Sequence, residues 1–88
     1  MGMALSLKIG MNVKAQIEND LALEVEAVAK YNTAIKDCVA AGDNASRELF
    51  DQLLKDEEAH IDYLEAQLHL IQEVGLETYL AQQIHEQE

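Results

Sequence analysis

The chain has 88 residues and a formal charge of −11, with 49% apolar residues, four glycines, a single cysteine and no proline. This length predicts one small domain, and the composition favours long helices over a sheet, so we expect an all-α fold. The negative charge excludes nucleic acid and anionic membrane surfaces as partners and favours cations. Without a long apolar run, a leader segment or a second cysteine for a disulfide, the sequence predicts a cytoplasmic protein.

Glycine and asparagine divide the chain into helical segments. Gly10 and Asn12 precede the first segment, the GDN sequence at 42–44 interrupts the pattern, and Gly75 closes the second segment. The predicted helices cover residues 13–41, 45–74 and 77–86, the first two having about seven turns each and the third being short. Because a short link joins the two long helices, we expect an antiparallel helical hairpin.

Apolar residues recur along both long helices at alternating spacings of three and four, the pattern of helices packed in a bundle. This seam consists of Ile17, Leu21, Glu24, Val28, Tyr31, Ile35 and Cys38 in the first helix, and of Phe50, Leu54, Glu57, Ile61, Leu64, Leu68 and Ile71 in the second. A glutamate interrupts the apolar series in each helix. Further apolar residues beside the seam make each apolar face wider than a two-stranded coil requires, so a second hairpin is needed to cover it.

The two seam glutamates need a partner, because an unpaired carboxylate taken out of water costs several kcal/mol. His60 follows Glu57 by three residues and lies about 60° away around the helix axis, so both side chains face one point. Glu24 is available from the facing helix. Carboxylates and an imidazole without thiolate suit iron or manganese and tolerate zinc, so we predict Glu24, Glu57 and His60 as metal ligands.

The sequence around these ligands is similar to a known family. Glu24 is followed seven residues later by Tyr31, and DEEAH at 56–60 contains a Glu-x-x-His motif. Ferritin-like carboxylate bundles use a Glu from each of two helices and a Glu-x-x-His from each of the other two, and this chain carries half of that set. More closely, the stretches KIGMNV, NDLALE, SRELFDQLL, KDEEAHIDYLEAQLHLI and GLETYLAQQI resemble the C-terminal half of a bacterioferritin, from about Leu7 onward.

The resemblance implies a homodimer in which two hairpins form a ferritin-like four-helix bundle, with the possibility of a higher-order shell. Such a dimer would bind two iron ions, with each Glu57 bridging them and Glu24 and His60 as terminal ligands. It would oxidise Fe(II) with dioxygen or peroxide, for iron storage or detoxification. Tyr31 would lie near the site, as a residue that hydrogen-bonds or is oxidised.

Haem is not expected. Bacterioferritins bind haem through a methionine that follows the bridging glutamate of the other half of the subunit, whereas Glu58 follows Glu57 here. The three methionines, Met1, Met3 and Met11, all precede the first predicted helix and cannot supply that ligand.

Other interpretations fit parts of the pattern. The chain could be a non-catalytic bacterioferritin-like module that pairs with another half-chain or a full ferritin. It could also be a rubrerythrin-like peroxide reductase, since that family shares the Glu-x6-Tyr and Glu-x-x-His spacings, although rubredoxin-type cysteines are missing here. Each of these residues could also have a purely structural role. Glu24 and Glu57 could lie in a partly exposed seam with water or lysine as partners, and Tyr31 and Cys38 could simply pack in the core. His69 and His85 could lie on the surface.

Overall fold

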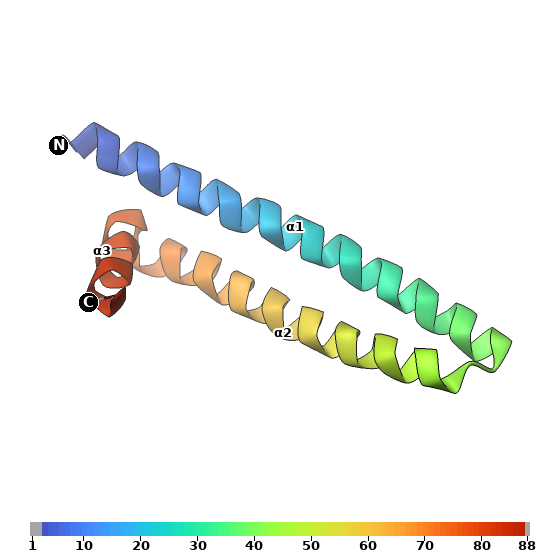
Figure 1. The fold of residues 1–88 in the computed structure, drawn as a ribbon. Coiled ribbons are helices and arrows are strands. Elements are labelled where there is room, and N and C mark those ends of the chain that lie inside the picture. Colours follow the sequence, from blue (N-terminus) through green and yellow to red (C-terminus); the bar gives the residue numbers. More distant parts are fainter. Residues whose placement is uncertain (1–2, 88) are drawn as a thin grey trace.

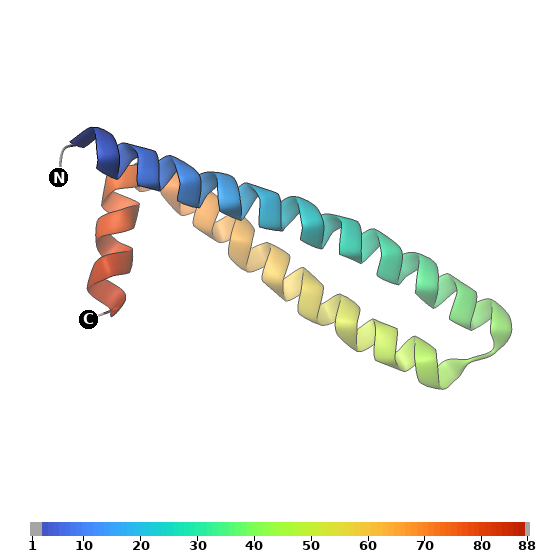
Figure 2. The same ribbon diagram turned by 45° about the horizontal axis from the view of Figure 1, so that its top comes forward.

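The structure, a computed structural model, describes the backbone of residues 3–87 and the side chains of residues 11–84. Over residues 3–87 it consists of three helices without a strand: α1 (Met3–Ala41), α2 (Asn44–Val74) and α3 (Leu76–Gln87). α1 and α2 run side by side in opposite directions, and α3 turns away from the end of α2 at a steep angle (Figures 1 and 2). The predicted all-α fold is confirmed.

The first helix is longer than the sequence pattern predicts. It begins at Met3 rather than at Val13, so Gly10 and Asn12 lie inside the helix and do not mark its start. A single glycine in a helix interior costs only about 1 kcal/mol relative to alanine, and the alanine, leucines and lysine that precede Gly10 favour helix. The predicted ends of α1 at Ala41 and of α2 at Val74 coincide with the structure, and the other three boundaries differ by one residue, since α2 begins at Asn44 and α3 runs from Leu76 to Gln87.

Local hydrogen bonds stabilise the turn between α1 and α2. Gly42 has φ of 70°, a conformation that favours glycine, and it donates a backbone hydrogen bond to the carbonyl of Val39 at 3.2 Å. The next N–H, of Asp43, donates to the carbonyl of Cys38 at 2.9 Å, so two of the last carbonyls of α1 have partners. The Asp43 carboxylate then accepts a hydrogen bond from the N–H of Ser46 at 3.1 Å and caps α2.

The most buried part of the described chain lies where α2 meets α3. Leu64, Ile71 and Tyr79 are each at most 6% exposed, and no other apolar residue among positions 11–84 is buried to that degree. Gly75, with φ of 85°, allows the chain to turn there, and the Tyr79 hydroxyl donates a hydrogen bond of 2.7 Å to Oε1 of Gln67. α3 therefore closes one end of the hairpin, where it also contacts α1.

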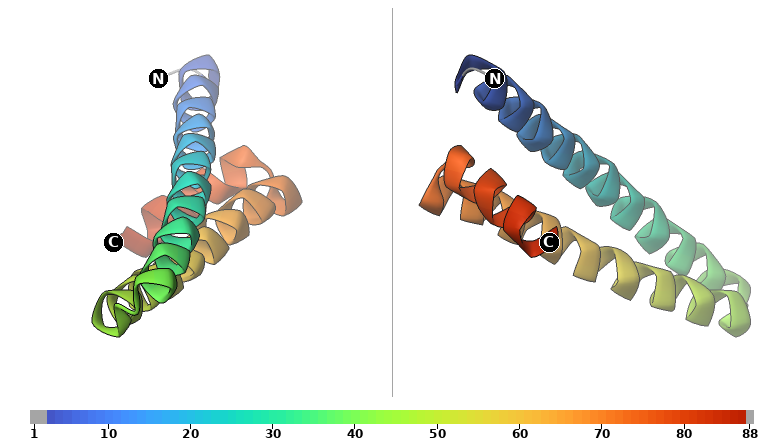
Figure 3. Two further views of the ribbon diagram at one scale, coloured as in Figure 1. Left: turned by 90° about the vertical axis from the view of Figure 1, so that its right-hand side faces the viewer. Right: turned by 60° about the vertical axis from the view of Figure 1, so that its left-hand side comes forward.

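The hairpin is elongated, with extents of 60 × 22 × 20 Å (Figure 3). Its accessible surface is 6523 Å², whereas a compact monomer of 9.8 kDa exposes about 5,200 Å² by the usual scaling of area with mass. The large apolar side chains that are exposed are Met11, Leu23, Val25, Val39, Leu49, Tyr63, Val74 and Ile84.

None of the described helices has a segment both long and apolar enough to cross a bilayer.

Candidate metal centre

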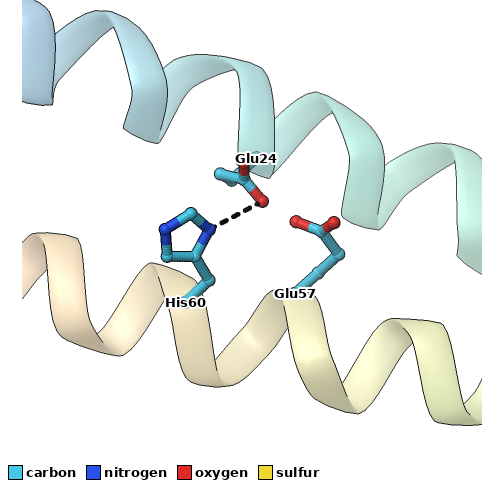
Figure 4. A group of neighbouring side chains, drawn as sticks. All are labelled: Glu24, Glu57 and His60. Carbon is cyan, nitrogen blue, oxygen red and sulfur yellow. Dashed lines mark ion pairs between the residues drawn. The ribbon is translucent and has the colours of Figure 1, made fainter.

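The three predicted ligands come together in the middle of the hairpin, across the seam between α1 and α2 (Figure 4). Glu24 projects from α1, and Glu57 and His60 project from successive turns of α2 toward it. One ligand atom of each residue lies within 4.8 Å of the other two. The structure groups no further histidine, cysteine, aspartate or glutamate with this trio among residues 11–84.

His60 and Glu24 interact across the seam. Nδ1 of His60 lies 3.4 Å from Oε2 of Glu24, a contact that becomes an ion pair when the imidazole is protonated. The Glu24 side chain is 22% exposed, whereas that of His60 is 52% exposed, so the imidazole stands at the open edge of the seam. The Glu57 carboxylate points toward that of Glu24 from the neighbouring turn of α2 (Figure 4).

Each glutamate has one buried oxygen without a hydrogen-bond partner. These atoms are Oε2 of Glu24 and Oε2 of Glu57, the two buried side-chain polar atoms of the described residues that remain unpaired. The 3.4 Å contact of Glu24 with His60 does not satisfy the geometry of a hydrogen bond. A buried acceptor of this kind costs about 1–3 kcal/mol, and more when charged. Two such oxygens facing one imidazole fit a divalent cation of iron or manganese type.

Tyr31 lies outside the trio. It follows Glu24 by two turns of α1, about 10 Å along the helix axis, and is half-buried in the seam. Its ring contacts that of Phe50, with 6.2 Å between centroids and 39° between planes. The contact shows a packing role for Tyr31, and its predicted role near the metal stays a prediction.

The residues beside the ligands are solvated. Asp56 and Glu58 flank Glu57 and are both exposed, and Asp56 accepts a hydrogen bond of 3.1 Å from Gln52. His69 is on the surface, 3.7 Å from Glu73. Only the central glutamate of the DEE sequence therefore enters the seam.

Five other residues discussed for the sequence lie away from the trio or outside the described side chains. Cys38 is half-buried and free, as a packing residue would be. Met11 is 64% exposed, whereas the side chains of Met1, Met3 and His85 lie outside the described residues.

A long antiparallel hairpin with a glutamate on one helix and a Glu-x-x-His on the other is half of a carboxylate-lined helical bundle. Comparison with known proteins identifies the family to which such a bundle belongs. Residues 4–74 match the model of the ferritin-like domain, and the chain belongs to this ferritin family.

Similar proteins of known name are bacterioferritins, as the sequence resemblance predicts. The chain is 49% identical over 73 residues to the bacterioferritin of Brucella melitensis, an alignment that covers 83% of this chain and 45% of the relative. It is 46% identical over 77 residues to that of Mycobacterium avium, covering 88% of this chain and 48% of the relative. It is 39% identical over 69 residues to the bacterioferritin of Rhodobacter capsulatus, covering 78% of this chain and 43% of the relative. The chain thus spans about half the length of the relatives that it matches.

Proposed function

We propose that two copies of this chain form an iron-binding four-helix bundle that oxidises Fe(II) for iron storage or detoxification. The observation that carries this proposal is the half-site of Glu24, Glu57 and His60, in which two buried carboxylate oxygens have no hydrogen-bond partner. The similarity to proteins named bacterioferritin supports iron as the metal. Manganese and zinc suit the same donors and are expected substitutes.

A second copy of the hairpin would complete the bundle. The single hairpin has about 1,300 Å² more surface than a compact chain of its mass, and exposed apolar side chains such as Leu23 and Leu49 contribute to it. Stable interfaces bury about 800 Å² on each partner, so this excess is large enough for a dimer. Two chains, each with two glutamates and one histidine, bring four carboxylates and two imidazoles into one interior.

Four carboxylates balance the charge of two divalent cations, so the filled interior would be neutral. By similarity to ferritin-like bundles, Glu57 of each chain would bridge the two ions, and Glu24 and His60 would bind one ion each. In the single hairpin, the exposed edge at His60 would give an ion a route into the seam from solvent before the second copy covers it. Such a dimer could itself be one unit of a larger shell.

The chemistry follows from holding two ferrous ions side by side. Each Fe(II) loses one electron, and dioxygen takes up both electrons with two protons to give hydrogen peroxide, or peroxide takes them up to give water. Tyr31, packed against Phe50 two turns from Glu24, is proposed to hydrogen-bond near the site or, where only one Fe(II) is bound, to supply the second of the two electrons that the oxidant takes up. No haem is expected, because Glu58 occupies the position after Glu57.

Anaerobic titration with Fe(II), followed by exposure to dioxygen or to peroxide, tests the function. We expect saturation at one iron per chain, two per dimer, and rapid formation of ferric absorbance with at least one oxidant. Glu57→Ala should abolish the oxidation, because it removes two carboxylates from each dimer, while Glu58→Ala, the same change on the exposed neighbouring residue, should leave it unchanged. Tight binding of iron to a stable monomer, or normal oxidation by Glu57→Ala, would contradict the proposal.

A further inference from the structure

The ligand set and the apolar face that a second copy would cover share one side of α2. Leu53 and Leu49 precede His60 by seven and eleven residues, spacings that return to the same side of a helix. Leu49 is 59% exposed and the His60 side chain is 52% exposed, so both are open in the single hairpin. A partner that covered the leucines would also cover the imidazole, and this would couple the binding of a cation to contact between chains.

Without a cation, the same contact places charges against each other. Each chain contributes two buried carboxylate oxygens that have no hydrogen-bond partner, so a dimer would enclose four. No lysine or arginine forms an ion pair with Glu24 or Glu57 among the described residues, and the ion pair at the seam is the one with His60. The formal charge of −11 per chain becomes −22 per dimer, twice the single value. Repulsion between the chains thus opposes the burial of their apolar faces.

We propose that a divalent cation controls assembly of this protein, so that the chain is mainly monomeric without the cation and dimeric with it. This inference rests on the proposed function, because it uses the same shared site. The imidazole at the open edge and the two carboxylates behind it form an incomplete site in the monomer. A second copy completes it, and the cation neutralises the carboxylates that otherwise keep the two copies apart.

Thermodynamic linkage sets the size of the effect. A cation that binds the dimer more tightly than the monomer must strengthen dimerisation by the corresponding factor, and coupling between sites is typically about 5–150-fold. Each dimer would bind two cations, so we expect the dimer dissociation constant to fall by at least about tenfold on saturation with metal. The effect must reverse when a chelator removes the cation.

Sedimentation velocity of the full chain, over a dilution series from nanomolar to micromolar, measures this change. The protein is first freed of metal with a chelator, and Zn²⁺ then serves as a probe that cannot be oxidised, with anaerobic Fe(II) as the second probe. We expect a predominantly monomeric boundary without metal and a dimer at the same protein concentration with either metal. Equal dimer dissociation constants with and without metal would overturn the inference.

Two matched variants separate the role of the seam charge from that of net charge. Glu57→Gln removes one seam charge per chain at nearly constant volume, and Glu58→Gln makes the same change on the exposed neighbouring residue. Glu57→Gln should dimerise more tightly than wild type without metal and respond little to it, whereas Glu58→Gln should keep the full metal dependence. If circular dichroism shows that Glu57→Gln is not folded, Glu24→Gln provides the same test from α1. Loss of the metal dependence in Glu58→Gln would contradict the assigned site.

Metal binding measured by competition with a chromophoric chelator distinguishes this inference from the function on which it rests. One cation bound per chain, to a protein that is already dimeric without metal throughout the dilution series, would overturn the control of assembly and leave the shared site standing. A cation bound to a chain that stays monomeric at micromolar concentration would overturn both. Saturation at one cation per chain together with a metal-dependent dimer supports both.

Discussion

Replacing Glu57 with leucine should make the metal-free protein more stable and abolish iron oxidation. Glu57 stands where the seam spacing calls for an apolar residue, is half-buried, and has one buried oxygen without a hydrogen-bond partner. Removing that oxygen relieves a penalty of about 1–3 kcal/mol. The leucine adds part of the burial energy of its side chain, up to about 1.5–3 kcal/mol when fully buried. Reorganisation of the seam offsets some of this gain, so we expect about 1–4 kcal/mol, the range seen when buried charges are replaced by packed apolar residues.

Thermal unfolding followed by circular dichroism, with a chelator present and at one fixed protein concentration, measures the stability. For a chain of this size 1 kcal/mol corresponds to about 4–8 °C, so the melting temperature should rise by at least about 4 °C. Glu58→Leu is the control, since it changes an exposed residue on the next position and should alter stability by no more than about 0.5 kcal/mol. A Glu57→Leu protein that melts below wild type and still oxidises iron normally would refute the reasoning, because Glu57 would then be a structural residue.

Three further substitutions test other parts of the structure. His60→Ala should weaken metal affinity by more than about 10–100-fold, which is the loss on removing a residue that only orients a ligand. It should barely lower the stability of the metal-free protein, because the His60 side chain is 52% exposed. Equilibrium metal binding and thermal melts measure the two effects. Hydrogen bonds from the Ser46 side chain and backbone lower the pKa of Asp43 below its ordinary value of 3.8. The ionised Asp43 carboxylate therefore stabilises the folded protein above pH 3.8, and this stabilisation is lost as the pH falls through the lowered pKa. Melts of wild type and Asp43→Asn, which keeps a capping oxygen but does not titrate, should therefore converge in acid, and parallel curves would contradict the cap. Tyr79→Phe should cost about 1 kcal/mol by removing the hydrogen bond to Gln67, and hydrogen exchange should show faster opening of α3.

The sequence identifies the parts of the candidate site because helical periodicity is local. The alternating spacing of three and four predicts which face of each helix is apolar, and Glu24 and Glu57 stand out as the charged residues on that face. The i, i+3 relation of Glu57 and His60 is fixed by the helix itself. The prediction from local sequence is wrong at the start of α1, where Gly10 is expected to mark the beginning of the helix. The helix tolerates this glycine because the surrounding residues favour the helical conformation.

Helical propensity, seam spacing and the order of the ligands are therefore determined by the sequence alone, because each depends on residues a few positions apart. Only the tertiary structure decides which ligand of α1 lies opposite which of α2, because that register depends on packing between residues more than thirty positions apart, such as Glu24 and His60 at 3.4 Å. It also decides that one oxygen of each glutamate is buried without a partner, since burial depends on every surrounding side chain. The tertiary structure also decides how α3 packs against α2. Packing buries Tyr79, and its hydroxyl donates a hydrogen bond to Gln67 of the neighbouring helix.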